Sequence, residues 1–494
     1  MRKNVVVIGG GIAGLSAGVY AQKCGFDVTI LESHSIAGGN CTAWKRKGYL
    51  FEGGMHWLTG TGKNEPMYTV WKHIGALDDS VEIHHPEPYR EFSFKDTTIR
   101  LHRDVDATEK HLIAVSPEDE KEIRALCNSV RKVKRLVMPL WDLKGVKVTK
   151  KRHPGLRSLF NFLSANRAMK KFSKISKEEY INKYKHEGIR EFFSRLLASK
   201  ASATWLCFSL GTQARGDGGF PHGGSLPFVG RIVKTYKDAG GKIVFNKRVD
   251  RIVIENGKAV GVEAGGLIYP ADAVIVASDT MQMEHLFETQ PKAAWLDEMK
   301  QKAEPTMGVL VSLGVNADLT KYNKDCIFKL EKPIYVFDVE HPCLNVTNYA
   351  NDPTYSPEGK AAVTLLFVSD TYDQWKEARE KGRYEEEKEK FAKTVIDALV
   401  DHMPEIAGNV EVYDVATPLT YERYCANWRG SWMTMMVGRM NMRAYPAVSD
   451  NLSGVYFAGH RMRPPGGLPI AAMSGRTAVQ YLCRDTGTLF ISEE

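Results

Sequence analysis

The chain has 494 residues, of which 43% are hydrophobic and 26% charged, with a formal net charge of +8. This composition is typical of a soluble globular protein, and the length is sufficient for two or three domains. Eight cysteines are scattered without a C-x-x-C pair, which indicates neither a zinc site nor a disulfide framework. No apolar run reaches the roughly 18 residues that span a bilayer, so we expect a cytoplasmic protein without a metal site.

A run of β-branched residues at 5–8 predicts a buried parallel strand. It leads into the pattern G-x-G-x-x-G, formed by Gly9, Gly11 and Gly14. The first glycine permits a tight turn, the second lets the backbone approach a pyrophosphate, and the third lets helix and strand pack closely. We expect a helix from about residue 12 to 24, whose positive N-terminal end faces that pyrophosphate.

The next predicted strand, at 27–31, ends at Glu32, 18 residues after Gly14. An acidic side chain at this place accepts hydrogen bonds from the ribose hydroxyls and repels a 2′-phosphate. Glycine-rich turns alone are common. Strand, glycines, helix, strand and acid in this register together indicate a dinucleotide site.

Two further glycine pairs follow, in GGN at 38–40 and in FEGGMHW at 51–57. This extension resembles that of the glutathione-reductase-type FAD proteins, in the branch that holds amine oxidases, phytoene desaturases and retinol saturase. That family usually has Arg in place of Asn40 and often Asp in place of Glu52. FAD is longer than an ADP unit, so the chain must continue beside the ribityl and the flavin. The resemblance adds five residues to the expected FAD contacts: Gly39, Asn40, Gly54, Met55 and His56.

Residues 128–200 form a basic segment with 20 Lys and Arg against five Asp and Glu, a net charge of +15. One predicted helical face carries apolar residues at i, i+3, i+4 and i+7, followed by basic ones: Leu156, Leu159, Phe160 and Leu163, then Arg167, Lys170 and Lys171. This pattern is typical of a helix at a membrane interface. A lid whose apolar face packs on the core is the alternative, and both stay open. Nucleic acid is not expected as a partner, because no reading motif accompanies the charge.

The glycine-rich stretch 212–224 resembles the lead-in that phytoene desaturases place before a helix, here at 226–239. Further strands follow, and the buried one at 273–278 closes the first sheet. In the family, the backbone at the position of Val249 holds the adenine, and we carry that role over to this chain.

Residues 281–445 contain strands such as 309–315 and a charged helix at about 373–402, which would build a substrate domain. Aromatic and arginine residues are dense at 416–432. This density favours either a pocket wall for an elongated apolar substrate or a packed junction between subdomains. The stretch is similar to the corresponding region of bacterial phytoene-desaturase-like oxidoreductases.

The last fifty residues predict a strand at 454–459 and, after a loop, a helix that begins near 468. Proline in the first turn and small residues after it let such a helix start approach a ligand closely. In the family this start lies at the pyrimidine edge of the flavin, where N–H groups and the helix dipole stabilise negative charge. The resemblance therefore implies a second group of cofactor contacts: Gly459, His460, Leu468, Pro469 and Ile470.

These elements predict an α/β protein with a Rossmann-like FAD-binding domain, a mixed α+β substrate domain and a basic helical lid. The expected boundaries are 1–75, 213–284 and 446–494 for the FAD-binding domain, 76–127 and 285–445 for the substrate domain, and 128–212 for the lid.

The resemblance implies hydride transfer between flavin N5 and a carbon–carbon bond of an apolar lipid, such as an isoprenoid, carotenoid or retinoid, in either direction. The sequence has no second G-x-G-x-x-G, so the electron partner is unknown: the substrate itself, a quinone, oxygen or a carrier protein. Three alternatives remain: a lipid double-bond isomerase without net redox, an amine oxidase, and a flavin-free prenyl-lipid or protein chaperone of the GDP-dissociation-inhibitor type.

His56 is the first candidate for acid–base catalysis, because imidazole titrates near neutrality, although a purely structural histidine is an equal alternative. Trp57 would form a wall beside the flavin ring. Four arginines are candidates for anchoring a carboxylate or polar head, with structural ion pairing as the alternative: Arg215, Arg423, Arg429 and Arg461.

Overall fold

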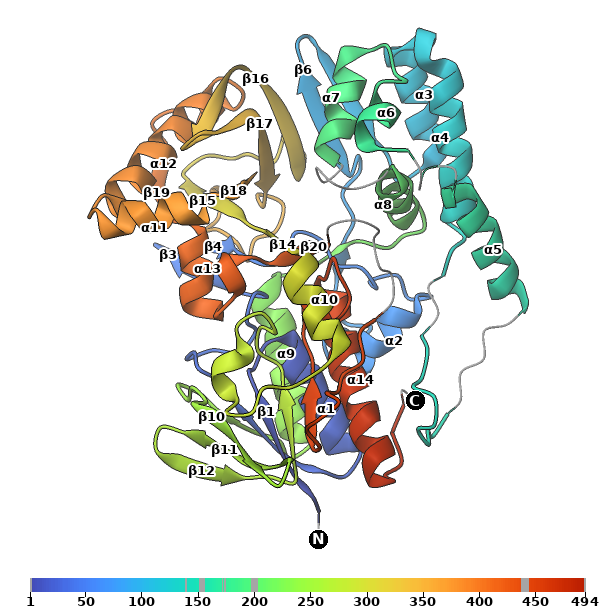
Figure 1. The fold of residues 1–494 in the computed structure, drawn as a ribbon. Helices are drawn as coiled ribbons and strands as arrows, with labels where there is room; N and C mark the ends of the chain where they lie inside the picture. Colours follow the sequence, from blue (N-terminus) through green and yellow to red (C-terminus); the bar gives the residue numbers. More distant parts are fainter. Residues whose placement is uncertain are drawn as a thin grey trace.

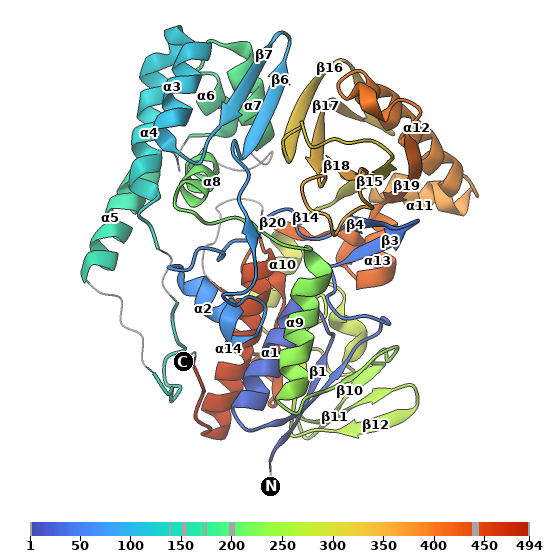
Figure 2. The same cartoon turned by 180° about the vertical axis from the view of Figure 1, so that it is seen from behind.

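The computed structural model of the chain describes residues 2–137, 140–150, 156–170, 172, 175–196, 203–436 and 444–492. Figures 1 and 2 show one half built around a parallel sheet, near the N-terminus. The other half has two lobes, a large sheet flanked by α11 and α12 and a group of helices from α3 to α8. The whole is the mixed α/β fold that the sequence predicts.

The first half is organised by a five-stranded sheet with the order β21-β13-β1-β2-β9, in which all neighbours are parallel. Its strands are β1 (Asn4–Ile8), β2 (Asp27–Leu31), β9 (Lys242–Val244), β13 (Ala273–Val276) and β21 (Val455–Phe457). Val5 pairs with Val28 on one side and with Ala273 on the other. Segments that are hundreds of residues apart in the sequence therefore meet in one sheet.

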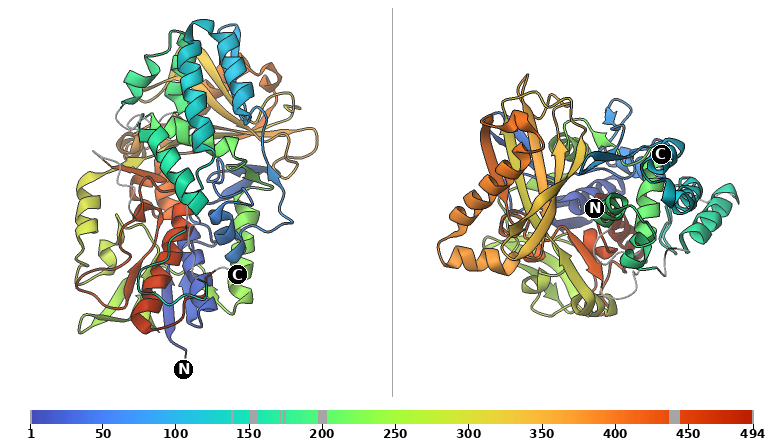
Figure 3. Two further views of the ribbon diagram at one scale, coloured as in Figure 1. Left: turned by 90° about the vertical axis from the view of Figure 1, so that its right-hand side faces the viewer. Right: turned by 90° about the horizontal axis from the view of Figure 1, so that it is seen from above.

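Three helices pack on this sheet: α1 (Ile12–Lys23), α9 (Ser225–Asp238) and α14 (Leu468–Thr486). Helices α1 and α14 lie side by side, blue and red in Figure 3. A Cβ atom at Gly475 would lie 2.3 Å from the carbonyl oxygen of Ala13 and 2.8 Å from the nitrogen of Ala17. The close approach of the two helices therefore requires glycine at this position.

The large sheet has seven strands in the order β19-β15-β18-β17-β16-β6-β7. These are β6 (Arg90–Phe94), β7 (Thr97–Leu101), β15 (Gly308–Val315), β16 (Asp325–Val336), β17 (Val339–Asn348), β18 (Ala361–Val368) and β19 (Val410–Ala416). The parallel pairing of β6 with β16 joins an early segment of the chain to a late one. The predicted domain boundaries themselves remain a prediction.

The prediction of one charged helix at 373–402 is wrong, because two helices occupy this stretch. Helix α11 (Tyr372–Glu380) ends before Gly382, and α12 (Tyr384–Val400) begins after it. Gly382 has φ +71°, a left-handed conformation in which neither helix can continue. Glycine adopts this conformation without strain.

The helical lobe has its own hydrophobic core, shared with β6 and β7. It comprises α3 (Val105–Val115), α4 (Glu120–Val133), α5 (Leu156–Lys170), α6 (Lys177–Ile181), α7 (Glu187–Leu196) and α8 (Thr204–Ala214). On α5, Ala165 and Ala168 are buried, whereas Phe160 and Leu163 are 73% and 59% exposed. The predicted apolar face therefore meets solvent at these two positions. The side chains of Leu156 and Leu159, and Lys171, lie outside the described residues.

Short elements connect the two halves or lie at their edges. They are β3 (Ala43–Arg46), β4 (Tyr49–Glu52), α2 (Pro66–His73), β5 (Ile83–His84), β8 (Phe220–Pro221), β10 (Arg251–Glu255), β11 (Lys258–Ala264), β12 (Leu267–Pro270), α10 (Ala294–Lys302), β14 (Ala303–Thr306), α13 (Pro418–Cys425) and β20 (Met433–Met436). Within the described ranges, no helix combines the length and apolar character needed to cross a membrane.

Candidate active site

One cavity of about 1920 Å³ is lined by residues of both halves. The start of α1, the end of β2 and the start of α14 form one part of its wall, and β3, α13, β20, α5 and α8 form the rest. Sites for a single drug-sized ligand usually enclose about 300–1,000 Å³. The cavity therefore has room for a dinucleotide and a second molecule together.

The turn between β1 and α1 places backbone at the cavity wall. Gly9 has φ +101°, and a Cβ atom at Gly14 would lie 1.9 Å from the Gly9 carbonyl oxygen. Gly11 is the N-cap of α1, and Gly9 and Gly11 both line the cavity. This arrangement places the glycine backbone and the positive end of α1 in the cavity wall.

Glu32 lies at the end of β2, where its side chain is buried but contributes to the cavity wall. One carboxylate oxygen accepts the N–H of Gly10 at 2.6 Å, and the other accepts the N–H of His34 at 2.7 Å. These two hydrogen bonds fix the carboxylate beside the turn between β1 and α1.

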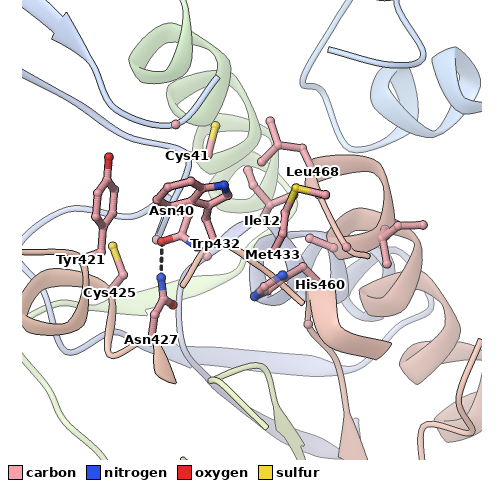
Figure 4. Close-up of a pocket in the computed structure, with 18 of the residues that line it drawn as sticks. Ile12, Asn40, Cys41, Tyr421, Cys425, Asn427, Trp432, Met433, His460 and Leu468 are labelled. Atoms are coloured by element: carbon pink, nitrogen blue, oxygen red, sulfur yellow. Dashed lines mark hydrogen bonds between the residues drawn. The ribbon is translucent and has the colours of Figure 1, made fainter. Parts of the chain in front are cut away.

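The segment with the second glycine pair, Gly53 and Gly54, packs against the segment with the first, Gly38 and Gly39. A Cβ atom at Gly54 would lie 2.0 Å from the carbonyl oxygen of Asn40. The Asn40 side-chain oxygen accepts a hydrogen bond of 2.5 Å from the Asn427 amide, so this segment is tied to the residues that follow α13 (Figure 4). Gly39, Asn40, Gly54 and His56 all line the cavity.

Glu52 organises the second glycine pair, a role that the sequence did not reveal. Its side chain is fully buried, and its oxygens accept the N–H groups of Gly54, Met55 and Ser225, each at 2.9 Å. The hydroxyls of Ser225 and Tyr355 donate to it as well. The only signal in the sequence was an acidic residue directly before a glycine pair.

The expected FAD contacts near the C-terminus lie in the segment before α14 and in the first turn of this helix. The Gly459 N–H donates to the hydroxyl of Ser474 at 2.8 Å, and His460 follows in the cavity wall. Both ring nitrogens of His460 are buried without a hydrogen-bond partner among the described residues. Burial lowers the pKa of His460 to about 3, so the ring is neutral near pH 7. Figure 4 shows it beside Met433 and Leu468.

Leu468, Pro469 and Ile470, the first residues of α14, also line the cavity. Three expected FAD contacts do not line it: Gly14, Met55 and Val249. Gly14 acts through close packing against Gly9, and Met55 is buried in the core. Val249 packs in a separate hydrophobic cluster, so the adenine contact of its backbone remains a prediction.

Three of the four candidate arginines are held in ion pairs: Arg215, Arg429 and Arg461. Arg429 pairs with Asp373 at 2.7 Å and is not in the cavity wall, so its expected anchoring role is withdrawn. Arg461 is 1% exposed, and its guanidinium donates twice to Asp279 at 2.7 Å, which positions the loop before α14.

Arg423 and Arg215 line the cavity, as does Arg461. Arg423 is exposed and lies over the Tyr424 ring at 5.2 Å. Arg215 is buried and pairs through Nε with Glu65 at 2.7 Å. Burial raises the pKa of Glu65 although Arg215 opposes the shift. No motif pointed to Glu65, which also lines the cavity.

His56 and Trp57 also line the cavity. Burial lowers the pKa of His56, which keeps its imidazole neutral and able both to accept and to donate a proton. Trp57 lies against Gly218, where a Cβ atom would come within 2.6 Å of the indole ring.

The remaining wall is largely apolar. On the helical side it contains Leu136, Leu140, Phe162, Met169, Trp205 and Phe208. On the other side it contains Tyr421, Trp432, Met433, Met435 and Met436, several of which appear in Figure 4. The aromatic stretch predicted at 416–432 therefore contributes to the pocket wall with Tyr421 and Trp432.

Comparison with known proteins gives one family match. The family described as flavin containing amine oxidoreductase matches residues 12–483. The chain is 25% identical over 480 residues to all-trans-retinol 13,14-reductase of Danio rerio, which covers 86% of this chain and 76% of that protein. It is 23% identical over 504 residues to prolycopene isomerase of Daucus carota, covering 98% and 80%.

Among solved structures, an oxidoreductase from Methanosarcina mazei aligns with a TM-score of 0.60. The alignment covers 97% of this chain and all of that one, at 18% identity, and shows a shared fold.

Proposed function

Since the chain belongs to the flavin containing amine oxidoreductase family and is an FAD-dependent oxidoreductase, we propose that it transfers a hydride between flavin N5 and a carbon–carbon bond of an apolar lipid. The observation that carries this proposal is the shared cavity. One continuous wall contains both the dinucleotide motifs and the apolar side chains of α5, α8 and β20. Bound FAD would supply the hydride donor or acceptor.

The residues present fit FAD. Glu32 offers a fixed carboxylate for the ribose, and the turn at Gly9 and Gly11 offers bare backbone for the pyrophosphate. His460 adds two buried ring nitrogens that have no partner in the part of the chain that the structure describes, and a polar group of a ligand would satisfy them. The first turn of α14 begins after Gly467, so its N–H groups can stabilise negative charge.

The chain's own residues would bind the substrate and move the proton. Trp205, Phe208 and Met433 exclude water from the reacting bond. Neutral His56, in the wall beside Trp57, can hold or release a proton at its imidazole. Arg423, at the exposed rim, remains a candidate for contact with a polar substrate end.

The proposal is tested by reducing the bound flavin without oxygen and adding a retinoid, a carotenoid or an unsaturated fatty acid in turn. We expect one class either to reoxidise the reduced flavin and gain two hydrogens or, added to the oxidised holoenzyme, to reduce the flavin and lose two hydrogens. In a parallel experiment an amine is added to the oxidised holoenzyme. If the amine reduces the flavin and none of the lipids changes the oxidation state of the flavin, the amine oxidase alternative replaces this proposal.

A second candidate is double-bond isomerisation without net redox, which the similarity to prolycopene isomerase supports. The two candidates differ in the mass of the product. An isomerase would return a product of unchanged mass and leave the flavin in the state in which it began.

We further propose that α5 contacts a membrane from which the substrate enters. Phe160 and Leu163 point to solvent on the same helix whose Phe162 and Met169 line the cavity, and Trp141, in the same basic segment of the sequence, is 66% exposed. The surrounding segment carries a net charge of +15. Each Lys or Arg close to an anionic surface contributes about 1 kcal/mol to binding, so this surface suits an anionic bilayer.

A further inference from the structure

A buried ion pair interrupts the apolar part of the cavity wall. Glu65, directly before α2, and Arg215, directly after α8, approach to 2.7 Å between Oε1 and Nε. Their side chains are 9% and 7% exposed, and both line the cavity. Trp57 and Met67 line the same cavity. The ion pair of Glu65 and Arg215 is therefore a polar site in a largely apolar wall.

Two buried nitrogens of the Arg215 guanidinium, Nε and Nη1, have no hydrogen-bond partner among the described residues, although Nε lies 2.7 Å from Glu65 Oε1 as an ion pair. The third nitrogen, Nη2, lies 3.4 Å from a carboxylate oxygen of Asp217. Buried donors in native proteins nearly always have a partner. A ligand oxygen in the cavity would supply one.

The charge around Arg215 decides which oxygen fits. Asp217 is fully buried, and its Oδ1 accepts the N–H groups of Gly60 and Thr61 at 2.7 and 2.8 Å. Behind it, Arg103 donates to the carbonyl oxygen of Asp217 at 3.1 Å. The two guanidinium groups, of Arg215 and Arg103, lie among three carboxylates, those of Glu65, Asp217 and Glu87, which leaves no surplus positive charge. A ligand carboxylate would therefore bring an uncompensated charge into a buried site, whereas a hydroxyl would not.

We propose that Glu65 and Arg215 form a subsite for the terminal hydroxyl of the apolar substrate and thereby select an alcohol over the corresponding carboxylic acid. Arg215 Nη1 donates to the hydroxyl oxygen, and the Glu65 carboxylate accepts the hydroxyl hydrogen. Both residues position the substrate and take no part in hydride transfer. This inference rests on the proposed function, because it assumes an apolar chain in the remainder of the cavity.

The test compares retinol with retinoic acid, which share one polyene and differ at its end. Dissociation constants are measured on the oxidised holoenzyme from the perturbation of the visible flavin spectrum. Wild type is expected to bind retinol about tenfold more tightly, the effect of a hydrogen bond to a charged group. In Glu65→Gln one negative charge is lost, so retinoic acid should bind about tenfold more tightly than it does to wild type.

Two further variants complete the design. Arg215→Lys, which keeps the charge but loses the planar fork, should weaken retinol binding about tenfold. Glu263→Gln is the matched control, since Glu263 pairs with Arg251 on the surface, and it should bind both ligands as wild type does. Retention of flavin by each variant shows that it has folded.

The outcomes separate this inference from the proposed function. If wild type binds both polyenes equally well and Glu65→Gln changes neither constant, the subsite is refuted while the apolar pocket stands. Tighter binding of retinoic acid than of retinol by wild type also refutes it. If the holoenzyme binds neither polyene, the inference and the proposed substrate class fall together.

Discussion

Glu52 shows how one buried carboxylate can hold three segments of chain together. It accepts N–H groups from the glycine pair after β4 and from the first residue of α9 and the hydroxyl of Tyr355, and its side chain is fully buried. Removal of such an acceptor leaves each donor buried and unpaired. The second glycine pair therefore depends on a residue that does not itself line the cavity.

We expect Glu52→Ala to lower the free energy of unfolding of the holoenzyme by about 3 kcal/mol, because several buried N–H groups lose their acceptor. Urea unfolding followed by tryptophan fluorescence measures this change. Glu263→Ala, in a partly exposed pair with Arg251, should cost about 1 kcal/mol or less. Equal losses in the two variants would show that Glu52 does not organise the loop.

His460 predicts a pH dependence of stability. Burial lowers its pKa to about 3, whereas the unfolded value is about 6.5, so the unfolded state binds the proton first as the pH falls. The contribution of His460 to the free energy of unfolding is fully present above the unfolded pKa. Below that pKa it is lost progressively, at up to about 1.4 kcal/mol per pH unit.

The measurement is urea unfolding of the holoenzyme at about pH 7 and about pH 5, on either side of the unfolded histidine pKa. His460→Asn should lose less stability than wild type between these two conditions. If the two proteins lose the same amount, His460 is not held neutral by its surroundings.

Among the elements, the contact of α1 with α14 is the most demanding. A Cβ atom at Gly475 would meet backbone atoms of α1 at 2.3 and 2.8 Å, which no side-chain rotation relieves. We expect Gly475→Ala to separate the two helices at the flavin end, weaken FAD retention and lower the unfolding free energy by about 2 kcal/mol. Gly230→Ala in α9, where a Cβ atom meets open space, is the control and should retain FAD. Full FAD retention by Gly475→Ala would show that this helix contact does not support the cofactor site.

Helix α5 carries the membrane proposal. Phe160→Ser with Leu163→Ser should reduce binding to anionic vesicles at least about fivefold, because two exposed apolar side chains no longer enter the interface. Flotation with vesicles of phosphatidylglycerol and phosphatidylcholine measures this. Turnover of a substrate dissolved in detergent should be unchanged. Binding equal to that of wild type would leave α5 as a solvated lid helix.

At the scale of the whole molecule, local patterns in the sequence were sufficient to predict the parallel sheet. A β-branched run, a glycine turn and an acidic residue at a fixed spacing each reflect contacts within a short segment, and the structure has them as β1, α1, β2 and Glu32. The helix start at Leu468 was predicted on the same basis.

Contacts between distant residues without a motif could not be predicted. The pair formed by Glu65 and Arg215 joins positions 150 residues apart, and its chemistry depends on burial that only the fold creates. Arg429 could not be separated from Arg215 in the sequence, because both are arginines in dense polar or aromatic stretches. The structure places one in a surface ion pair and the other in the cavity wall.

The central claim is that residues from both ends of the chain hold one FAD against an apolar pocket in which a carbon–carbon bond reacts. A single-turnover experiment without oxygen tests it most directly, by comparing the amount of flavin that changes oxidation state with the amount of lipid that gains or loses two hydrogens. We predict equal amounts. A flavin that changes state only with an amine, or a lipid product of unchanged mass, would contradict the claim.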